Sequence, residues 1–307
     1  MPSRLIVGAG YLGKRLAEAW QAQGDTVFAV TRSAEKAALF ESEGLIPVVA
    51  DVTRSETLGR LPTVDTLVFC VAYDRQSHES PYQVYAEGMR NVLLSPAGES
   101  ACIVHISSTG VYGDHAGEWT DECSPTRPVR QSAKALLEAE NILRSSPAGP
   151  RSIVLRLAGI YGPGRIPLLR NLIQDLVLPG EAQAVVNLIH VDDAVTAVLL
   201  ASQDASRPNV FNVSDGQPVT RADFYRELAR LLNLPVPRFD NPSQEGASEG
   251  SERSFNKGAT RGTGHKRVSN HKICRELGFS CRYPSYREGL AAVVRADLAG
   301  ETLQDRV

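Results

Sequence analysis

The sequence predicts an α/β fold, in which helices cover both faces of a doubly wound parallel sheet and a smaller C-terminal domain follows. Short apolar runs alternate with amphipathic stretches through residues 1–215, as strands and helices do in successive βα units. The apolar runs lack polar residues at every second position, which is typical of strands buried on both faces of a parallel sheet. With 307 residues, the chain is long enough for one large domain and one small domain.

The predicted elements follow one another in a regular order. Strands are expected at 4–9, 26–30, 45–50, 65–72, 101–107, 152–160, 184–191 and 209–214. Apolar residues with a helical period predict helices at 11–23, 33–42, 81–95, 134–143, 193–203 and 220–233. Thr220 is a suitable N-cap for the last of these helices, with Asp223 in its first turn. Residues 241–264 are rich in Gly, Ser and charged residues and predict a long loop.

Composition and charge exclude several classes of protein. The 33 basic and 35 acidic residues nearly cancel, so neither nucleic acid nor a membrane surface is expected as a partner. No stretch approaches the ~18 apolar residues of a membrane span, and the N-terminal apolar stretch is too short for a signal peptide. Five scattered cysteines form no CxxC pair, which predicts neither a metal site nor a disulfide framework. We therefore expect a cytoplasmic protein.

A glycine-rich turn separates the first predicted strand from the first predicted helix. In IVGAGYLG, Gly8 permits a tight turn, Gly10 lets the backbone approach a pyrophosphate, and Gly13 lets the helix pack closely on the strand. The N-terminus of the helix supplies amide donors and a partial positive charge. A turn needed only for packing is the alternative, but the strand–turn–helix context favours a dinucleotide-binding site. Tyr11 and Leu12, inside the motif, are also predicted to contact the cofactor.

The end of the second predicted strand distinguishes NAD from NADP. An acidic residue roughly 20 positions after the glycine motif would bind the ribose hydroxyls of NAD. Here FAVTRSAEK has Arg32 at that point and no acid before Glu35. A guanidinium can pair with a 2′-phosphate, so we expect NADP before NAD; a solvated surface arginine is the alternative. Asp51, at the end of the third strand, either accepts a hydrogen bond from the adenine amine or caps the following turn.

Five further motifs follow in order along the chain: HISSTGVYGD, EWTDECSPTRP, RQSAKALLEAE, RLAGIYGPGR and NLIHVDDAV. Together with the glycine motif, this ordered set resembles the extended short-chain dehydrogenase/reductase family, which includes nucleotide-sugar epimerases and dehydratases. The resemblance runs from Leu5 to the C-terminal KRVSNHKICRELGF. It implies a Rossmann domain, here residues 1–162, and a substrate domain, here residues 163–307, with 184–215 returning to the first sheet.

The resemblance also implies roles for individual residues. Ser108 matches the hydroxyl that positions the alcohol or carbonyl of the substrate, and Lys134 matches the lysine that binds the nicotinamide ribose. The family's catalytic tyrosine, four residues before that lysine, is replaced by Arg130, whose guanidinium cannot act as a base near neutral pH. Tyr85 stands where the family has an asparagine, three residues before Gly88. The sequence thus resembles an atypical branch that lacks the active-site tyrosine.

Three side chains near the expected reaction site have alternative roles. Arg130 either forms a structural ion pair with Asp121 or Glu122, or faces the cleft and binds a carboxylate or phosphate of the ligand. Arg165 is a second candidate for binding an anionic substrate group, or a solvated loop residue. Tyr73, directly after the fourth strand, is either a proton-transfer residue or an ordinary wall contact.

Two functions are consistent with these motifs. The first is an NADP-dependent oxidoreductase or epimerase/dehydratase-like enzyme that acts on a hydroxyl or carbonyl compound, such as a nucleotide sugar, without the usual tyrosine base. The second is a non-catalytic NADP(H)-binding sensor or docking protein. A small-molecule substrate is the expected partner. The family resemblance also implies a homodimer formed through the helices at 81–95 and 132–144.

Overall fold

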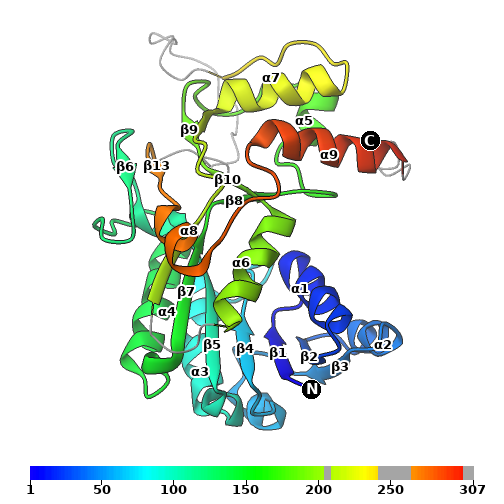
Figure 1. Ribbon diagram of the computed structural model, residues 1–307, viewed down its shortest axis with the longest axis vertical. Helices are drawn as coiled ribbons and strands as arrows, with labels where there is room; N and C mark the ends of the chain where they lie inside the picture. The colour runs from blue at the N-terminus through cyan, green and yellow to red at the C-terminus, as the bar shows by residue number, and fades with distance from the viewer. Residues whose placement is uncertain (204–208, 241–263, 300–307) are drawn as a thin grey trace.

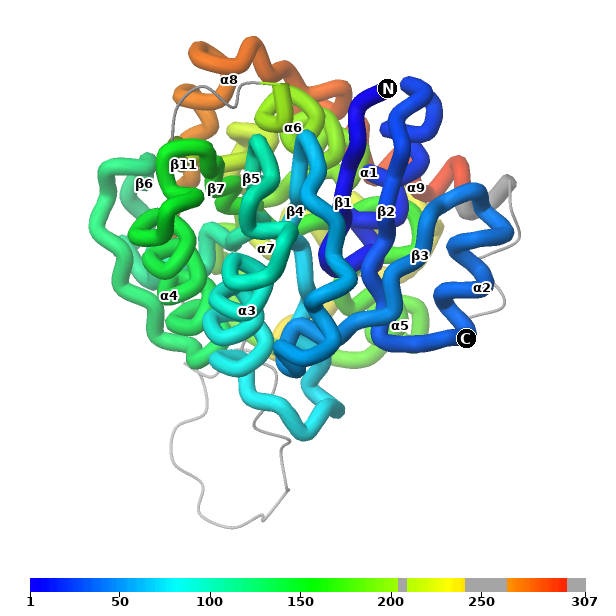
Figure 2. The backbone as a smooth tube through the Cα atoms, turned by 90° about the horizontal axis from the view of Figure 1, so that it is seen from below, coloured from blue at the N-terminus to red at the C-terminus, as the bar shows by residue number. Residues whose placement is uncertain are grey.

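The computed structural model describes residues 1–203, 209–240 and 264–299. Its centre is a seven-stranded sheet, which Figure 2 shows from below in the order β11-β7-β5-β4-β1-β2-β3. All neighbouring strands in this sheet run parallel. The strands are β1 (Ser3–Val7), β2 (Thr26–Thr31), β3 (Ile46–Val49), β4 (Thr66–Phe69), β5 (Cys102–Ser108), β7 (Ser152–Leu157) and β11 (Asn209–Val213). The predicted doubly wound α/β fold is confirmed.

Each face of the sheet has its own apolar core. On one face, α1 (Tyr11–Ala22), α2 (Ala34–Ser42) and α6 (Val191–Gln203) bury residues such as Leu16, Trp20 and Phe40. On the other face, α3 (Gly88–Leu94) and α4 (Gln131–Ser145) bury residues such as Met89 and Leu143. Strands covered on both sides need apolar residues at consecutive positions, which explains the continuous apolar runs in the sequence.

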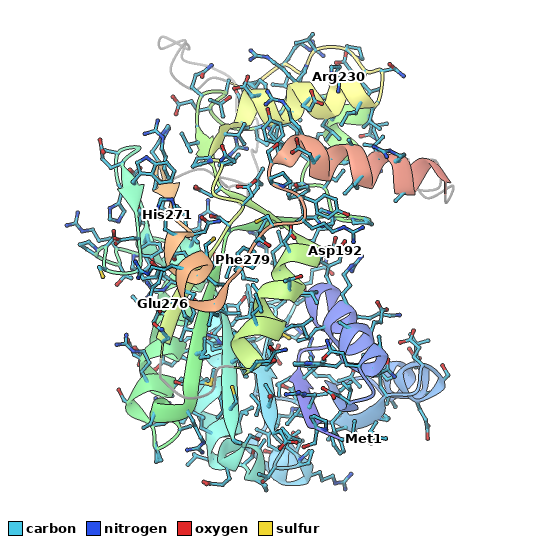
Figure 3. All side chains as sticks on the ribbon, viewed as in Figure 1. Met1, Asp192, Arg230, His271, Glu276 and Phe279 are labelled. Atoms are coloured by element: carbon cyan, nitrogen blue, oxygen red, sulfur yellow. The ribbon has the colours of Figure 1, made fainter. Side chains whose placement is uncertain are left out.

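The C-terminal domain lies above the sheet in Figure 1 and has a third apolar core. It contains α5 (Leu169–Ile173), α7 (Arg221–Leu231) and α9 (Tyr286–Ala299). Two small sheets join it to the rest: β8 (Gly159–Tyr161) pairs with β10 (Leu188–His190), and β9 (Val185–Val186) pairs with β12 (Val219–Thr220). After these, α8 (His271–Leu277) returns to the large sheet, where Phe279, labelled in Figure 3, is buried in the first core.

Several predicted elements are divided in the structure. The strand expected at 152–160 is β7 followed by β8, and the strand expected at 184–191 is β9 followed by β10. Of the region 184–215, β11 is the strand that lies in the large sheet. The helix expected at 81–95 begins as a π-helical turn, η2 (Gln83–Glu87), and continues as α3. Apart from Gly264, the predicted loop 241–264 lies outside the described residues.

Neither a membrane span nor a metal site was expected from the sequence. In the described ranges, no helix is long and apolar enough to cross a membrane. The same ranges contain no group of three or more His, Cys, Asp or Glu side chains arranged to hold a metal ion.

Candidate functional site

A cleft of about 1030 Å³ lies at the carboxyl ends of the sheet strands. The glycine-turn half of this cleft is lined by the residues that follow β1, β2 and β3. The opposite end, which we call the far half, is lined by the N-terminus of α4, by residues 164–168 and 185–188, by Gly264 and Lys266, and by α7. The strand order changes direction between β1 and β4, and ligands of doubly wound sheets bind at such a point.

The glycine turn has the close contacts that the motif predicts. Gly8 has a φ of +103°, and a Cβ atom on it would lie 2.7 Å from the backbone nitrogen of Val71. A Cβ on Gly13 would lie 2.6 Å from the carbonyl oxygen of Gly8, so these two positions require glycine for packing. A Cβ on Gly10 would instead have no described atom within 4 Å. Gly10 therefore leaves room at the N-terminus of α1, whose first turn has no acidic residue.

Tyr11 joins the glycine turn to the loop that follows β8. Its hydroxyl donates a hydrogen bond of 3.0 Å to the carbonyl oxygen of Pro163. The guanidinium groups of Arg15 and Arg165 lie 4.1 and 5.2 Å from the centre of the Tyr11 ring. Leu12, the neighbouring residue, is buried and also lines the cleft. Both residues predicted from inside the motif are thus at the cleft wall.

Two cations lie in the cleft wall after β2. Arg32 is exposed and lines the glycine-turn half, as does Lys36 one helical turn later. Glu35, between them in the sequence, is not among the cleft-lining residues. Asp51 also lines this half, and its Oδ1 accepts hydrogen bonds from the backbone nitrogen and the hydroxyl of Thr53, at 2.9 and 2.8 Å. The turn-capping role considered for Asp51 is therefore present in the structure.

Ser108 lies at the carboxyl end of β5 and lines the cleft. Its Oγ accepts a hydrogen bond of 3.1 Å from the backbone nitrogen of Gly110. The hydroxyl proton can then be donated to a ligand oxygen. A Cβ on Gly110 would lie 3.3 Å from the Ser108 Oγ and 3.9 Å from the Cβ of Ala133, so α4 passes next to this serine.

The face of α4 that lines the cleft is offset by one residue from the expected face. Ser132, Ala133 and Leu136 of α4 line the cleft, with the spacings of three and four that mark one side of a helix. Val129 lines it just before the helix begins. Lys134 is exposed and is not among the cleft-lining residues, so its position does not support the expected contact with the nicotinamide ribose. Arg130 is the N-cap residue of α4 and does line the cleft.

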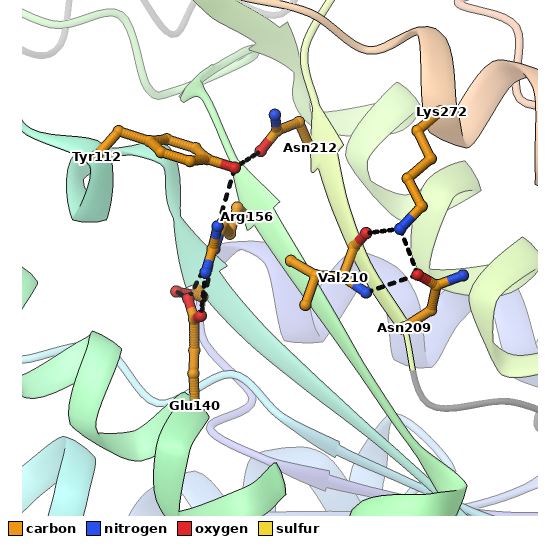
Figure 4. Close-up of polar contacts among 8 residues, drawn as sticks. Tyr112, Glu140, Arg156, Asn209, Val210, Asn212 and Lys272 are labelled. Carbon is orange, nitrogen blue, oxygen red and sulfur yellow. Dashed lines mark hydrogen bonds and ion pairs between the residues drawn. The ribbon is translucent and has the colours of Figure 1, made fainter. Parts of the chain in front are cut away.

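A buried polar network fixes the orientation of α4 and is drawn in Figure 4. Glu140, on the cleft-facing side of α4, forms an ion pair of 2.6 Å with Arg156 of β7, and both side chains are at most 5% exposed. Arg156 also donates to the hydroxyl of Tyr112, which donates to the Oδ1 of Asn212, at 2.9 and 2.8 Å. Ser107, in the cleft wall, donates to Glu140 at 2.5 Å. Removing one member would leave a buried charge without compensation.

The two carboxylates considered as partners of Arg130 accept hydrogen bonds from other groups. The Oδ1 of Asp121 accepts from the backbone nitrogen of Cys123 and from the hydroxyl of Ser124, at 3.0 and 2.9 Å. The Oε1 of Glu122 accepts from the backbone nitrogen of Asn212 at 2.7 Å. Arg130 lines the cleft wall, and its contact with a ligand stays a prediction.

Tyr73 does not line the cleft, whereas Tyr85 does. The hydroxyl of Tyr85 accepts a hydrogen bond of 3.0 Å from the backbone nitrogen of Tyr73, and burial raises the pKa of Tyr85. A phenol with a raised pKa stays protonated near neutral pH. Tyr85 thus supports the loop after β4, and the position of Tyr73 does not support the role in proton transfer that was considered for it.

Three cleft-lining cations were missed by the sequence interpretation: Lys36, Arg221 and Lys266. Lys36 follows Arg32 by four residues, and this helical spacing is a signal that could have been used. Arg221 directly follows the predicted cap Thr220, which places it in the first turn of α7. Lys266 follows the Gly- and Ser-rich stretch, and no local pattern indicates that it reaches the cleft.

Comparison with known proteins identifies the family. The sequence profile of the NAD dependent epimerase/dehydratase family matches residues 4–214. The chain belongs to this family. The epimerase/dehydratase family shares the Rossmann fold and NAD(P)-dependent oxidoreductase chemistry of extended short-chain dehydrogenases/reductases, so the resemblance inferred from the motifs is confirmed.

Relatives match the chain over most of its length. Protein YeeZ of Escherichia coli K12 is 31% identical over 290 residues, which cover 91% of this chain and 95% of that protein. The dTDP-6-deoxy-L-talose 4-dehydrogenase (NAD(P)(+)) of Kitasatospora kifunensis is 26% identical over 279 residues, or 82% and 86% of the two chains. The structure of a putative NAD-dependent epimerase/dehydratase from Methylobacillus flagellatus is 30% identical, with a TM-score of 0.72 and coverage of 96% and 98%.

Proposed function

We propose that the protein binds NADP(H) in the glycine-turn half of the cleft and interconverts a carbonyl and a hydroxyl compound held beside Ser108. The observation that carries the proposal is the position of Ser108: its hydroxyl lies in the same cleft as the glycine turn, and its oxygen already accepts from Gly110. The serine proton is therefore available to a ligand oxygen. When bound, the nicotinamide supplies or accepts the hydride.

The glycine-turn half has the features that a dinucleotide needs. Gly10 leaves space at the N-terminus of α1 for a pyrophosphate, which the amide groups and the positive helix end stabilise. Tyr11 and Leu12, inside the glycine motif, and Asp51, after β3, line the same half of the cleft. These residues fit the dinucleotide cofactor of the family, and we propose them as its binding site.

The preference for NADP rests on charge at the end of β2. Arg32 and Lys36 both line the cleft there, and Glu35 does not. A 2′-phosphate carries negative charge that both cations attract, whereas the free ribose hydroxyls of NAD would need an acceptor carboxylate. Lys36 adds a second cation to the one predicted from the sequence.

We propose that the protein works without the usual tyrosine–lysine pair. Arg130 stands at the position of the tyrosine, and Lys134 does not line the cleft. Ala133, the α4 residue near Ser108, cannot donate or accept a proton. During reduction, Ser108 would hydrogen-bond the carbonyl oxygen while the hydride adds to its carbon, and the proton of the new hydroxyl would come from water in the cleft.

The missing tyrosine also favours a second candidate function, a non-catalytic NADP(H)-binding protein. Stopped-flow oxidation of bound NADPH distinguishes the two. A panel of carbonyl compounds that includes nucleotide ketosugars is mixed with the NADPH-loaded protein, and the loss of NADPH absorbance is recorded. Oxidation that is at least about tenfold slower in Ser108→Ala supports the enzyme. Tight NADPH binding without oxidation by any member of the panel supports the sensor.

We also propose a homodimer formed through α3 and α4, as the family resemblance implies. Leu93, Leu94 and Ile142 line a shallow groove between these helices, and Leu94 is 81% exposed. Sedimentation velocity measures the oligomeric state directly, and Leu94→Glu should convert a dimer into a monomer. A parent protein that sediments as a monomer at all concentrations would contradict the proposal.

A further inference from the structure

We infer that Ser132 of α4 is a second catalytic hydroxyl, which hydrogen-bonds the reacting oxygen of the substrate together with Ser108 and passes a proton to it. This inference rests on the proposed function, because it takes the cleft to hold a carbonyl compound beside Ser108. It adds a residue from a different element and a route for the proton in a site that lacks the tyrosine of the family.

Ser132 belongs to a row of residues along one side of α4. Ser132, Leu136 and Glu140 follow one another at intervals of four, the spacing of neighbours on one helix face. The first two line the cleft. Glu140 lies further along the same row, where it accepts a hydrogen bond from Ser107 and pairs with Arg156 (Figure 4). Because this anchor fixes the rotation of α4, the side of the helix that carries Ser132 is held toward the cleft.

The chain just before α4 is held against the turn that follows β5. The backbone nitrogen of Arg127 donates a hydrogen bond of 3.2 Å to the carbonyl oxygen of Tyr112. A Cβ atom on Gly113, whose φ is +72°, would lie 2.1 Å from the carbonyl oxygen of Arg127. These two backbone segments are therefore in direct contact, and Ser108 lies just before the turn, at the end of β5. Ser132 and Ser108 thus come from two elements that are fixed to each other at the cleft.

The hydroxyl of Ser132 is available to a ligand. The side chain is half-buried and forms no hydrogen bond with another described residue. Two hydroxyls at the end of β5 are already engaged: Ser107 donates its proton to Glu140, and the oxygen of Ser108 accepts from Gly110. Ser132 keeps its proton and both lone pairs for the ligand and for water. It can therefore donate on one side and accept on the other, which passing on a proton requires.

Ser132 protonates the substrate oxygen as the hydride adds to the carbonyl carbon. The electron pair of the C=O bond moves to the oxygen, which takes the proton of the Ser132 hydroxyl. The serine oxygen takes a proton from a water molecule in the cleft, and solvent neutralises the hydroxide that remains. Of the three α4 residues that line the cleft, Ser132, Ala133 and Leu136, Ser132 is the one with a proton to donate. Ser108 stays a hydrogen-bond donor to the same oxygen.

A bound aldehyde that cannot be reduced tests the contact without turnover. The probe is para-methoxybenzaldehyde, isotope-labelled at the carbonyl carbon and bound to the protein loaded with oxidised NADP, which has no hydride to give. Isotope-edited infrared spectroscopy measures the C=O stretching frequency, which each hydrogen bond to the oxygen lowers. We expect Ser132→Ala and Ser108→Ala each to raise this frequency. Ser132→Thr keeps a hydroxyl and should leave the frequency near that of the parent.

The rate of NADPH oxidation provides a second measurement. Ser132→Ala should slow single-turnover reduction of the best substrate of the carbonyl panel by about tenfold or more, because no positioned donor then protonates the oxygen. Ser132→Thr should retain most of the rate. Ser145→Ala is the matched control, because Ser145 is the exposed last residue of α4 and does not line the cleft. Thr109→Val removes a hydroxyl that lines the cleft but is buried, and its effect should be smaller.

The outcomes separate this role of Ser132 from the proposed function. A C=O frequency that rises in Ser108→Ala but not in Ser132→Ala, or a parental rate in Ser132→Ala, would overturn the inference and leave the proposed function intact. A frequency that rises in neither variant, or a parent that binds no aldehyde, would count against the proposed function and the inference together. Thermal unfolding and NADPH titration of each variant show that the fold and the cofactor site are intact.

Discussion

The two halves of the cleft differ in how their residues are arranged along the chain. The glycine-turn half is lined by residues 8–12 and by Arg32 and Lys36, from two short segments at the ends of adjacent strands. The far half combines Arg130, Arg221 and Lys266, which come from three distant segments. The first half is shaped by a glycine turn of the backbone, whereas the second is lined by charged side chains. The first kind of site is visible in a short sequence motif and the second is not.

The largest expected effect separates the backbone site from the fold. Gly10→Val should weaken NADP(H) binding on the order of a thousandfold, because the side chain would occupy the space of the pyrophosphate and remove two or more charge-assisted hydrogen bonds. A Cβ at Gly10 meets no described atom, so the fold should be unaffected. Fluorescence titration and thermal unfolding measure the two effects. Gly59→Val is the matched control, because its Cβ also meets nothing within 4 Å. Parental affinity in Gly10→Val would show that the pyrophosphate lies elsewhere.

The next prediction tests which side of α4 meets the substrate. Arg130→Tyr restores the tyrosine of the family's pair but should give no increase in NADPH-dependent turnover, because Lys134, its partner four residues later, does not line the cleft. Steady-state rates of the variant and the parent with the best substrate of the carbonyl panel measure this effect. An increase of about tenfold or more in Arg130→Tyr would show that the side of α4 was assigned incorrectly.

The smallest effect concerns cofactor choice. Arg32→Ala should reduce the preference for NADPH over NADH by roughly tenfold, the contribution of one charge-assisted pair, and Lys36→Ala should reduce it by less. Glu35→Ala is the control on the same helix, because Glu35 does not line the cleft. Competitive fluorescence titrations give both affinities for each variant. Equal affinity of the parent for the two cofactors would leave Arg32 as a solvated arginine.

The fold and the glycine-turn half could be predicted because the signals are local. Buried strands need continuous apolar residues, and the positive φ of Gly8 requires glycine, so both leave a pattern in a few consecutive positions. The division of the predicted strand 184–191 has a long-range cause. The side chain of Asn187, between β9 and β10, bonds to the backbone of residues 266 and 268, nearly eighty positions away. No window of sequence contains that contact.

The orientation of α4 could not be predicted for a related reason. Helix periodicity alone does not show whether the side of α4 that carries Ala133 or the side that carries Lys134 faces the cleft, because neighbouring residues differ by only about 100°. The choice depends on Glu140, which is buried against Arg156 of another element. Lys266 was missed because its position depends on the pairing of β13 (Arg267–Val268) with β6 (Trp119–Thr120), across a stretch without apolar period.

The Glu140–Arg156 pair also has a consequence for how the chemistry of this cleft can change during evolution. Because the pair holds the C-terminal part of α4 in place, a one-residue insertion between Lys134 and Glu140 would turn the N-terminal part by about 100°. Lys134 would then take the place of Ala133 near Ser108. A single codon gained or lost ahead of this anchor can therefore change which side chains of α4 line the cleft, with every amino acid otherwise unchanged.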